Sequence, residues 1–521
     1  MVEYIEHQLV KKNKIQKRLY QELLTAKALE KNTLVVAPTG LGKTIVAVLV
    51  IAYTYNKDKS VLLLSPTKPL ITQHYKSLID LLEIQTEKII LLTGEIDPKK
   101  RKDLYKEKGI IICATPQTID NDINNNYINQ NNFNLIIFDE AHRATKNYAY
   151  CNISKYFEND LKRLALTASP GFNKQKIEDV ANNLKIDHIE IRTDTDLDVV
   201  DYIKDVEIDT KYIDLDAHSK QVSSIIDQII SKKIELLQKF GFKLTTNFSK
   251  KQILEIQKSI FARINDSKKN PINFIAISQI TQITKILHAK ELIETQGFFS
   301  FQNYMNKLIL ESKQVSASKS IKQLVNSADF IELKNYLEKN KDKLKYNKEE
   351  ELLKILKEFI KKNPKSKILV FSNFRDNANH LVNLINKSKD IKSVRFVGQA
   401  TKINDKGLSQ KEQIKIISEF KEGIYNCLVC TSVGEEGLDI PSVDLVLFYD
   451  SVPSEIRNIQ RRGRTGRFNV GKVVLLINKD TIDEKYYYVS QNKERKMKKF
   501  LSNYNSKKPS KKKKQKTILD F

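Results

Sequence analysis

Residues 33–53 read TLVVAPTGLGKTIVAVLVIAY, in which a β-branched apolar run is joined to a second apolar run by a short loop with two glycines. A strand, a glycine loop and a helix in this order are the context that a P-loop requires. Units of this kind build parallel sheets, because the helix carries the chain back across one face of the sheet. The stretch therefore predicts an α/β fold with a site for the phosphates of a nucleotide.

The loop contains each kind of group that a nucleoside triphosphate needs. Glycine permits the tight turn, so the backbone N–H groups of Gly40, Leu41 and Gly42 can wrap the β-phosphate. Lys43 is expected to neutralise the β and γ oxygens, and Thr44 is expected to ligate Mg²⁺. ATP and Mg²⁺ are therefore the expected cofactors. The predicted ATP-binding residues of the loop are Thr39, Gly40, Leu41, Gly42, Lys43 and Thr44.

A second apolar run, NLIIFDEAH at residues 134–142, ends in two carboxylates. If this run is a strand of the same sheet, its end delivers Asp139 beside the metal, and Glu140 can polarise the attacking water. An isolated acidic pair at the end of a strand would indicate only a turn. Combined with the P-loop, the pair predicts ATP hydrolysis.

The segment IQRRGRTGR, residues 459–467, gathers four arginines. Such a cluster of guanidinium groups is expected to remain solvated or to meet an anion, because it cannot bury itself. If a second domain folds against the first, Arg464 and Arg467 reach the γ-phosphate as arginine fingers of the same chain. The site would then be complete only when the domains close, which couples hydrolysis to domain motion. The four residues are Arg461, Arg462, Arg464 and Arg467.

The apolar pattern divides the chain of 521 residues into four parts. Short β-branched runs alternate with helical patterns from about 30 to 200 and again after about 365, which predicts two α/β domains. Between them apolar residues recur at steps of three and four, as in Ile226, Ile229 and Ile230, which predicts an all-helical insert rich in lysine. After about 490, lysine, serine and asparagine dominate, and we expect a disordered basic tail. The expected boundaries are 1–205, 206–350, 351–490 and 491–521.

The net charge of the chain indicates which kind of molecule it binds. The chain has 89 basic and 63 acidic residues, and this excess of 26 positive charges favours a polyanion such as nucleic acid. A generally lysine-rich proteome is the alternative explanation. The N-terminus lacks a signal pattern and no apolar run reaches the ~20 residues of a membrane span, so we expect a soluble, cytoplasmic protein without a membrane partner. Cys427 and Cys430 are expected on a core strand and not in a metal site.

These motifs together resemble those of superfamily 2 helicases, and longer strings such as FDEAHRA, RFVGQA, GLSQKEQ and ELIETQG resemble archaeal Hef and its relative FANCM. The resemblance runs to about residue 490, and the fold it implies is two RecA-like domains with a helical insert that grips branched DNA. Its motifs are RLYQ (Gln21, the adenine-reading Q motif), PTGLGKT, SPTKPL, TGE, ATPQT, DEAH, TAS, VFSNFR, FVGQA, TSVGEEGLDIP and QRRGRTGR.

The resemblance implies further roles. His142, Thr167 and Ser169 would couple the nucleotide site to DNA, and Gln460 would help hold the water or the γ-phosphate. The residues expected near the ribose are Gly437 and Asp439, and those expected on the sugar-phosphate backbone are Thr67, Lys68, Thr115 and Thr431. Contacts of this kind read DNA shape more than base order. The implied activity is a 3′ to 5′ DNA helicase or translocase, associated with the nucleoid, that acts on forks and branched DNA in fork repair and recombination.

Long Hef proteins continue into a nuclease domain marked by ERKxxxD. Here ERKMKKF has Phe500 in place of the carboxylate, so we expect no nuclease activity. Because the nuclease part supplies dimer contacts in the long Hef proteins, we also expect a monomer. Two other functions stay open. One is an RNA-directed ATPase of the group of Dicer and the innate RNA sensors, and the other is a clamp-bound scaffold in which hydrolysis is vestigial.

The last residues, QKTILDF, resemble the PIP box that binds the sliding clamp (PCNA). Gln515, Ile518 and Phe521 follow each other at steps of three, so they can share one face of a 3₁₀ turn, with the two apolar side chains in a pocket. The usual motif has a second aromatic residue, and we expect its lack here to weaken binding.

Overall fold

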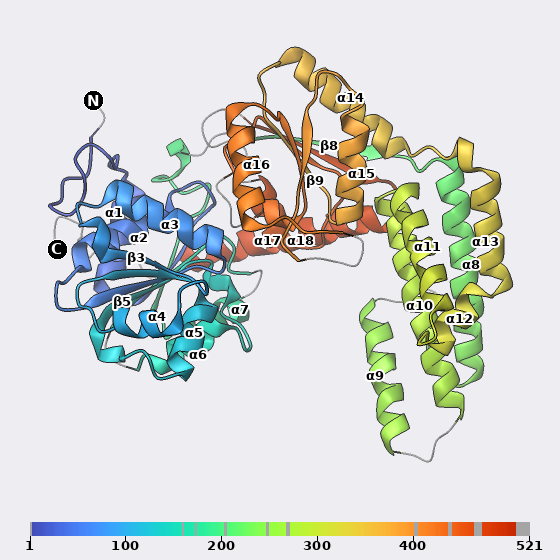
Figure 1. The fold of residues 1–521 in the computed structure, drawn as a ribbon, viewed down its shortest axis with the longest axis horizontal. Coiled ribbons are helices and arrows are strands. Elements are labelled where there is room, and N and C mark those ends of the chain that lie inside the picture. The colour runs from blue at the N-terminus through green and yellow to red at the C-terminus, as the bar shows by residue number, and fades with distance from the viewer. Residues whose placement is uncertain are drawn as a thin grey trace.

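The computed structural model describes residues 3–158, 161–171, 174–202, 206–245, 250–266, 271–400, 405–435, 440–462 and 471–506. They form two parallel sheets and a helical arm that projects from the second sheet (Figure 1). We call the helices from α8 to α13, residues 217–339, the arm. The predicted fold class, two RecA-like α/β domains with an all-helical insert between them, is confirmed.

The first sheet has the strand order β3-β4-β2-β5-β6-β1-β7, and every neighbouring pair is parallel. Apolar clusters bury both of its faces under helices. The strands are β1 (Thr33–Val36), β2 (Ser60–Leu64), β3 (Ile89–Leu92), β4 (Ile111–Ala114), β5 (Phe133–Phe138), β6 (Lys162–Thr167) and β7 (His188–Ile191). The helices are α1 (Leu19–Glu30), α2 (Lys43–Thr54), α3 (Lys68–Leu81), α4 (Pro98–Leu104), α5 (Pro116–Asn124), α6 (Ala149–Tyr156) and α7 (Lys174–Asn183).

The second sheet has the order β10-β11-β9-β12-β13-β8 and is also parallel. Cys427 and Cys430 lie on its strand β11 and are fully buried, so the prediction of a core strand is confirmed. The strands are β8 (Val206–Ile213), β9 (Ile368–Phe371), β10 (Ser393–Phe396), β11 (Cys427–Cys430), β12 (Leu445–Phe448) and β13 (Gly471–Asn478). The helices are α14 (Asn347–Lys362), α15 (Arg375–Ile385), α16 (Gln410–Glu422) and α17 (Glu455–Arg462).

Strand β8 shows that the helical insert begins later than the expected residue 206. Residues 206–213 pair in parallel register with β13, from Gly471 to Asn478, and the first helix of the insert, α8, begins at Ala217. The strand forms the edge of the second sheet and none of its residues is fully buried, so it lacks the continuous apolar run that marks the central strands. Its partner lies more than 250 residues later in the chain, and only the folded sheet shows the pairing.

The arm shares its core with the second sheet. One continuous buried cluster includes Ile286 and Phe301 of the arm together with Ile368, Val370 and Leu447 of the sheet. The arm is therefore an extension of the second domain. Its helices are α8 (Ala217–Lys239), α9 (Lys250–Asp266), α10 (Pro271–Thr295), α11 (Phe298–Lys313), α12 (Lys319–Val325) and α13 (Ala328–Lys339).

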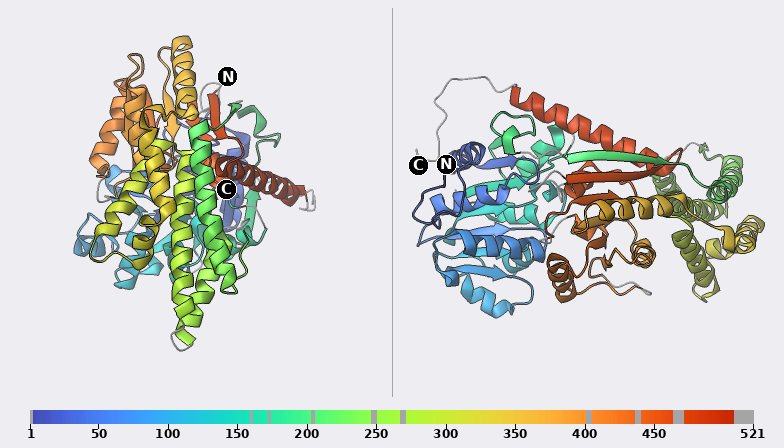
Figure 2. Two further views of the ribbon diagram at one scale, coloured as in Figure 1. Left: turned by 90° about the vertical axis from the view of Figure 1, so that its right-hand side faces the viewer. Right: turned by 90° about the horizontal axis from the view of Figure 1, so that it is seen from above.

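Helix α18 (Ile482–Ser506) corrects the expected start of the tail at residue 491. It begins beside β13 and runs from the second domain to the first (Figure 2). Met497 and Leu501 pack into the apolar cluster of the first domain, and the Nζ of Lys498 lies 2.9 Å from Oδ2 of Asp194. Met497 and Leu501 are four residues apart and so lie on one face of the helix. They are surrounded in the sequence by lysines, and for this reason the composition of the segment does not indicate a packed helix. Residues 507–521, with the PIP-like segment, lie outside the described residues.

Short 3₁₀ turns occur at η1 (Thr86–Lys88), η2 (Gln130–Asn132), η3 (Ala141–Arg143), η4 (Val200–Tyr202), η5 (Lys341–Lys343) and η6 (Ser432–Gly434). Across the described ranges, no helix combines the length and the apolar character that a membrane crossing would need.

Candidate nucleotide site

The P-loop lies between β1 and α2 at the carboxyl edge of the first sheet. Gly40 and Gly42 have φ values of 88° and 70°, in the left-handed region that glycine adopts without a steric cost. A Cβ on Gly42 would lie 2.6 Å from Nε2 of Gln21, whereas one on Gly40 would meet no atom within 4 Å. The loop therefore presents open space beside Gly40, as a cradle for phosphates requires, whereas Gln21 lies close against Gly42.

Helix α1 brings Gln21 against this loop. The side chain is buried, and its Nε2 donates a hydrogen bond to the carbonyl of Leu41 at 3.1 Å. The hydroxyl of Tyr20 donates to the same carbonyl at 3.0 Å. The Q-motif residue and the P-loop are thus joined directly.

Lys43 opens helix α2, and its Nζ donates to the carbonyls of Ala37 and Pro38 at 3.0 and 3.2 Å. Thr44 follows in the first turn of the helix, and Thr39 precedes the two glycines. Positive charge from the ammonium group and from the helix N-terminus therefore meets at one place. This arrangement fits the triphosphate of ATP.

Asp139 directly follows β5, where its N–H continues the ladder by donating to the carbonyl of Leu64 at 2.9 Å. Its Oδ2 lies 2.8 Å from Nε2 of His74 and accepts from the hydroxyl of Ser65 at 3.2 Å. Burial alone would raise the pKa of the Asp139 carboxyl, but the charges of His74 and Lys43 outweigh burial, and the pKa lies below its usual value. The carboxylate stays ionised, as a magnesium ligand must.

No sequence pattern points to His74, and Ser65 stands out only as the first residue of the string SPTKPL. His74 lies on α3, in the second turn after Thr67, and no local pattern marks it. Its role depends on the packing of α3 against the end of β5.

Glu140, His142 and Thr167 form a connected set. Glu140 has a φ of 48°, which turns the chain sharply after Asp139. Nδ1 of His142 lies 3.2 Å from Oε2 of Glu140 and 3.1 Å from Oγ1 of Thr167. The N–H of Ser169 donates to that same hydroxyl at 3.2 Å. The residues expected to couple hydrolysis to DNA binding are therefore in direct contact.

The residues expected on DNA lie at the ends of strands. Thr67 caps α3, Lys68 pairs with Glu95 at 2.5 Å between Nζ and Oε2, and Thr115 precedes α5. Thr431 follows β11 and is only 6% exposed, so a phosphate contact through its side chain requires movement of its neighbours.

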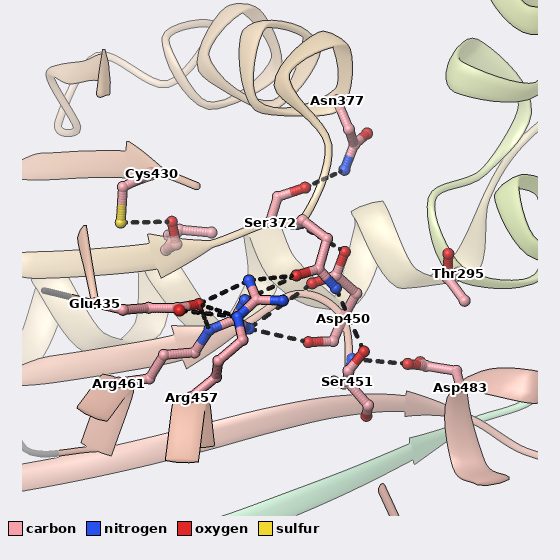
Figure 3. Close-up of polar contacts among 12 residues, drawn as sticks. Thr295, Ser372, Asn377, Cys430, Glu435, Asp450, Ser451, Arg457, Arg461 and Asp483 are labelled. Carbon is pink, nitrogen blue, oxygen red and sulfur yellow. Dashed lines mark hydrogen bonds and ion pairs between the residues drawn. The ribbon is translucent and has the colours of Figure 1, made fainter. Parts of the chain in front are cut away.

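The arginine cluster differs from expectation, because Arg461 is completely buried. Its Nε donates to Oε1 of Glu435 at 2.7 Å (Figure 3). Its guanidinium carbon lies 4.9 and 5.4 Å from the ring centres of Phe371 and Phe448. Arg457 forms a second, forked contact with Glu435. The carboxylate of Glu435 thus neutralises the charge of Arg461, and two aromatic rings pack against the guanidinium group.

The structure describes two further predicted residues of the arginine segment, Gln460 and Arg462. Gln460 lies on α17 beside Arg461, and Arg462 pairs with Glu494 of α18 at 2.5 Å. The predicted residues Gly437, Asp439, Arg464 and Arg467 lie outside the described residues.

A cleft of about 730 Å³ opens between the domains. The first domain contributes Thr67, His142 and Arg143, and the second contributes Asn373 and Arg457. The arm and α18 also reach it, through Glu291 and Tyr486. The motifs of both domains therefore face one shared space.

Three family models match successive parts of the chain. Residues 9–172 match "Type III restriction enzyme, res subunit", residues 218–343 match "Putative ATP-dependent RNA helicase, helical bundle", and residues 347–469 match "Helicase conserved C-terminal domain". The three ranges correspond to the first domain, the arm and the second domain.

Among curated proteins, the "Putative ATP-dependent RNA helicase MJ1505" of Methanocaldococcus jannaschii is 43% identical over 96% of this chain. The "ATP-dependent DNA helicase mph1" of Neurospora crassa is 33% identical over 91%. The chain spans 62% and 42% of the length of these two relatives.

Among solved structures, the Hef helicase domain of Pyrococcus furiosus matches with a TM-score of 0.70 and 39% identity. The match covers 92% of this chain and all of that one. The chain belongs to the Hef and FANCM family of superfamily 2 helicases.

Proposed function

We propose that the chain is the motor of an ATP-driven DNA helicase or translocase that acts on forked or branched DNA. The shared core of the arm and the second sheet carries the proposal, because any change in the angle between the two domains then moves the arm. Residues 217–343 contain 21 Lys or Arg and 11 Asp or Glu, an excess suited to a polyanion. Closure of the cleft on ATP would in this way move bound DNA.

The first domain is proposed to hold ATP and magnesium. Thr44 and Asp139 would hold the metal, Lys43 would bind the β and γ oxygens, and Glu140 would take the proton of the attacking water. ATP supplies the γ-phosphoryl group for this hydrolysis. Arg464 and Arg467 are proposed to reach that group when the domains close, because α17 leads directly into their segment.

The contacts proposed with DNA come from hydroxyl groups and a lysine at the strand ends, namely Thr67, Lys68, Thr115 and Thr431. Such groups read backbone shape. The resemblance to Hef and FANCM supports movement in the 3′ to 5′ direction and a role in fork repair and recombination.

An RNA-directed ATPase is the second candidate. The name of the M. jannaschii relative and the family model for the arm both refer to an RNA helicase. DNA is favoured by the name of the N. crassa relative and by the match to Hef over the full length of its helicase domain.

A panel of nucleic acids tests the proposal. We expect forked DNA and four-way junctions to stimulate the ATPase at least about tenfold more than duplex RNA, and to be unwound or branch-migrated. Stronger stimulation by duplex RNA would favour the second candidate. The affinity for the fork should also fall about a hundredfold between about 50 and 200 mM salt, as about four phosphate contacts imply. An affinity that does not change with salt would contradict the use of the basic arm on DNA.

We propose that Gln515, Ile518 and Phe521 bind the sliding clamp. The basic stretch before them, with the pattern of one polar and two large apolar residues, supports this role. Deletion of residues 515–521 is expected to abolish capture by PCNA and to leave the DNA-stimulated ATPase unchanged. Clamp binding that persists after the deletion would place the contact elsewhere.

We propose that the string ERKMKKF has no nuclease role. Met497 packs into the first domain and Glu494 pairs with Arg462, so these residues serve helix α18.

A further inference from the structure

Gln296 and Gly297 form the turn between α10 and α11, and close contacts restrain the conformation of this turn. Gln296 follows α10 and is completely buried. Gly297 has a φ of 96°, and a Cβ there would lie 2.7 Å from the ring of Tyr346. The N–H groups of Gln296 and Gly297 both donate to the carbonyl of Leu292, at 2.8 and 3.0 Å. A displacement of α10 is therefore passed to Gln296.

The amide of Gln296 leaves the arm and enters the carboxyl edge of the second sheet. Its Nε2 donates to Oδ2 of Asp450, two residues beyond β12, and to Oγ1 of Thr295 at 3.0 Å. Its Oε1 accepts from the hydroxyl of Ser372, directly after β9, at 3.1 Å. One side chain of the arm thus bonds two strand ends of the motor.

Both strand ends lead to Arg461. Arg461 donates to the carbonyl of Asp450 at 3.4 Å and to Oδ1 of Asn373, the neighbour of Ser372, at 2.9 Å. The N–H of Asn373 donates to Oδ2 of Asp450 at 2.9 Å. Figure 3 shows Ser372, Asp450 and Arg461 side by side. Gln296 is therefore linked to the buried guanidinium of Arg461 through one intervening residue, Asp450.

The carboxylate of Asp450 depends on the hydrogen bond from the Gln296 amide. Its carboxylate is buried, and its Oδ1 accepts no hydrogen bond from any described residue. Burial raises the pKa of the Asp450 carboxyl, and the charge of Arg461 opposes that rise. Gln296 and Asn373 are therefore the donors that hold this carboxylate in place, and loss of one leaves a buried charge poorly satisfied.

We propose that Gln296 is a positioning residue through which DNA bound on the arm controls the ATPase. Tension on α10 moves Gln296, which shifts Asp450 and Ser372 and so reorients Arg461 and α17, the helix that leads to Arg464 and Arg467. The inference rests on the proposed function, because it requires that the arm carry DNA.

Gln296→Glu tests the link with almost no change of shape. The new carboxylate replaces the donor to Asp450, and the two like charges repel. We expect DNA-stimulated kcat to fall about tenfold, while the ATPase without DNA and the KM for ATP stay within about twofold. A purely structural role would lower basal and stimulated rates together. Forked DNA is the probe, with single-stranded DNA and duplex RNA in parallel.

Three further variants make the result decisive. Gln296→Glu/Asp450→Asn restores one donor and one acceptor and keeps one carboxylate near Arg461, so it should regain stimulation. Gln314→Glu makes the same charge change at an exposed site of the arm and should behave as wild type. If Gln296→Glu does not fold, Ser372→Ala removes the hydroxyl that donates to Gln296 and accepts from Nδ2 of Asn377, and it should lower stimulation in part.

Equal stimulation of Gln296→Glu and wild type would overturn the inference alone. A proportional loss of basal and stimulated rates that the double variant does not repair would overturn it too. A wild-type protein that no nucleic acid stimulates would overturn the proposed function, and the inference with it.

Discussion

Glu140→Gln is expected to lower the kcat of ATP hydrolysis by about 10²- to 10⁴-fold and to leave ATP and DNA binding largely intact. Glutamine keeps the size of the side chain and its contact with His142 but cannot take a proton from water. The main-chain turn at Glu140, with its φ of 48°, is retained because the backbone there depends on η3 and not on the charge. Steady-state ATPase and equilibrium binding to a labelled fork measure the two effects separately.

Glu107→Gln provides the matched control, because Glu107 is an exposed acidic residue of the same domain. It should hydrolyse ATP at the wild-type rate. DNA unwinding or branch migration that survives in Glu140→Gln would show that hydrolysis does not drive the protein. The proposal of an ATP-driven motor would then be wrong.

Lys348→Met is expected to cost about 3–5 kcal/mol of stability, because it breaks a buried ion pair by removing one partner. Lys348 and Asp483 are both completely buried, and Nζ lies 2.5 Å from Oδ2. Asp483 also accepts from the N–H groups of Ser451 and Asn478, at 2.8 and 3.2 Å. Without the lysine, this carboxylate is a buried charge without a counterion. Urea unfolding followed by circular dichroism measures the loss as a lower midpoint.

Two comparisons separate the charge from the packing. Lys354→Met, on the exposed face of the same helix, should change stability by less than about 0.5 kcal/mol. Lys348→Met/Asp483→Asn removes both charges and should recover a large part of the loss. A midpoint for Lys348→Met equal to that of Lys354→Met would mean that the buried pair does not support the junction of α14, β12 and α18.

The two parallel sheets and the helical arm could be predicted because their signals are local. An apolar strand run, a glycine turn and the change of period from two to three or four each lie within about 20 residues. The resemblance to Hef and FANCM rests on short strings of the same kind, and the comparison structure confirms it. Asp139 and Glu140 could be chosen as candidates because they end an apolar strand run, and Lys43 because it follows the glycine loop that joins a strand run to a helical run.

Arg461 shows where local reasoning fails. Four arginines in nine residues read as a solvated or anion-binding cluster, yet Arg461 is enclosed by Phe371, Phe448 and Glu435. These partners come from three other segments of the chain. Burial of a charge is decided by what surrounds it, and no window of sequence contains that information.

The phosphate loop, the acidic strand end, the two α/β domains and the family can all be predicted from the order of residues, because each depends on neighbours along the chain. Only the folded chain shows that β8 belongs to the second sheet, that α18 crosses to the first domain, and that the arm shares the core of the second domain. It also placed Gln296 between Asp450 and Ser372. Each of these depends on contacts between residues from about 75 to more than 300 positions apart, which form only when the whole chain is packed.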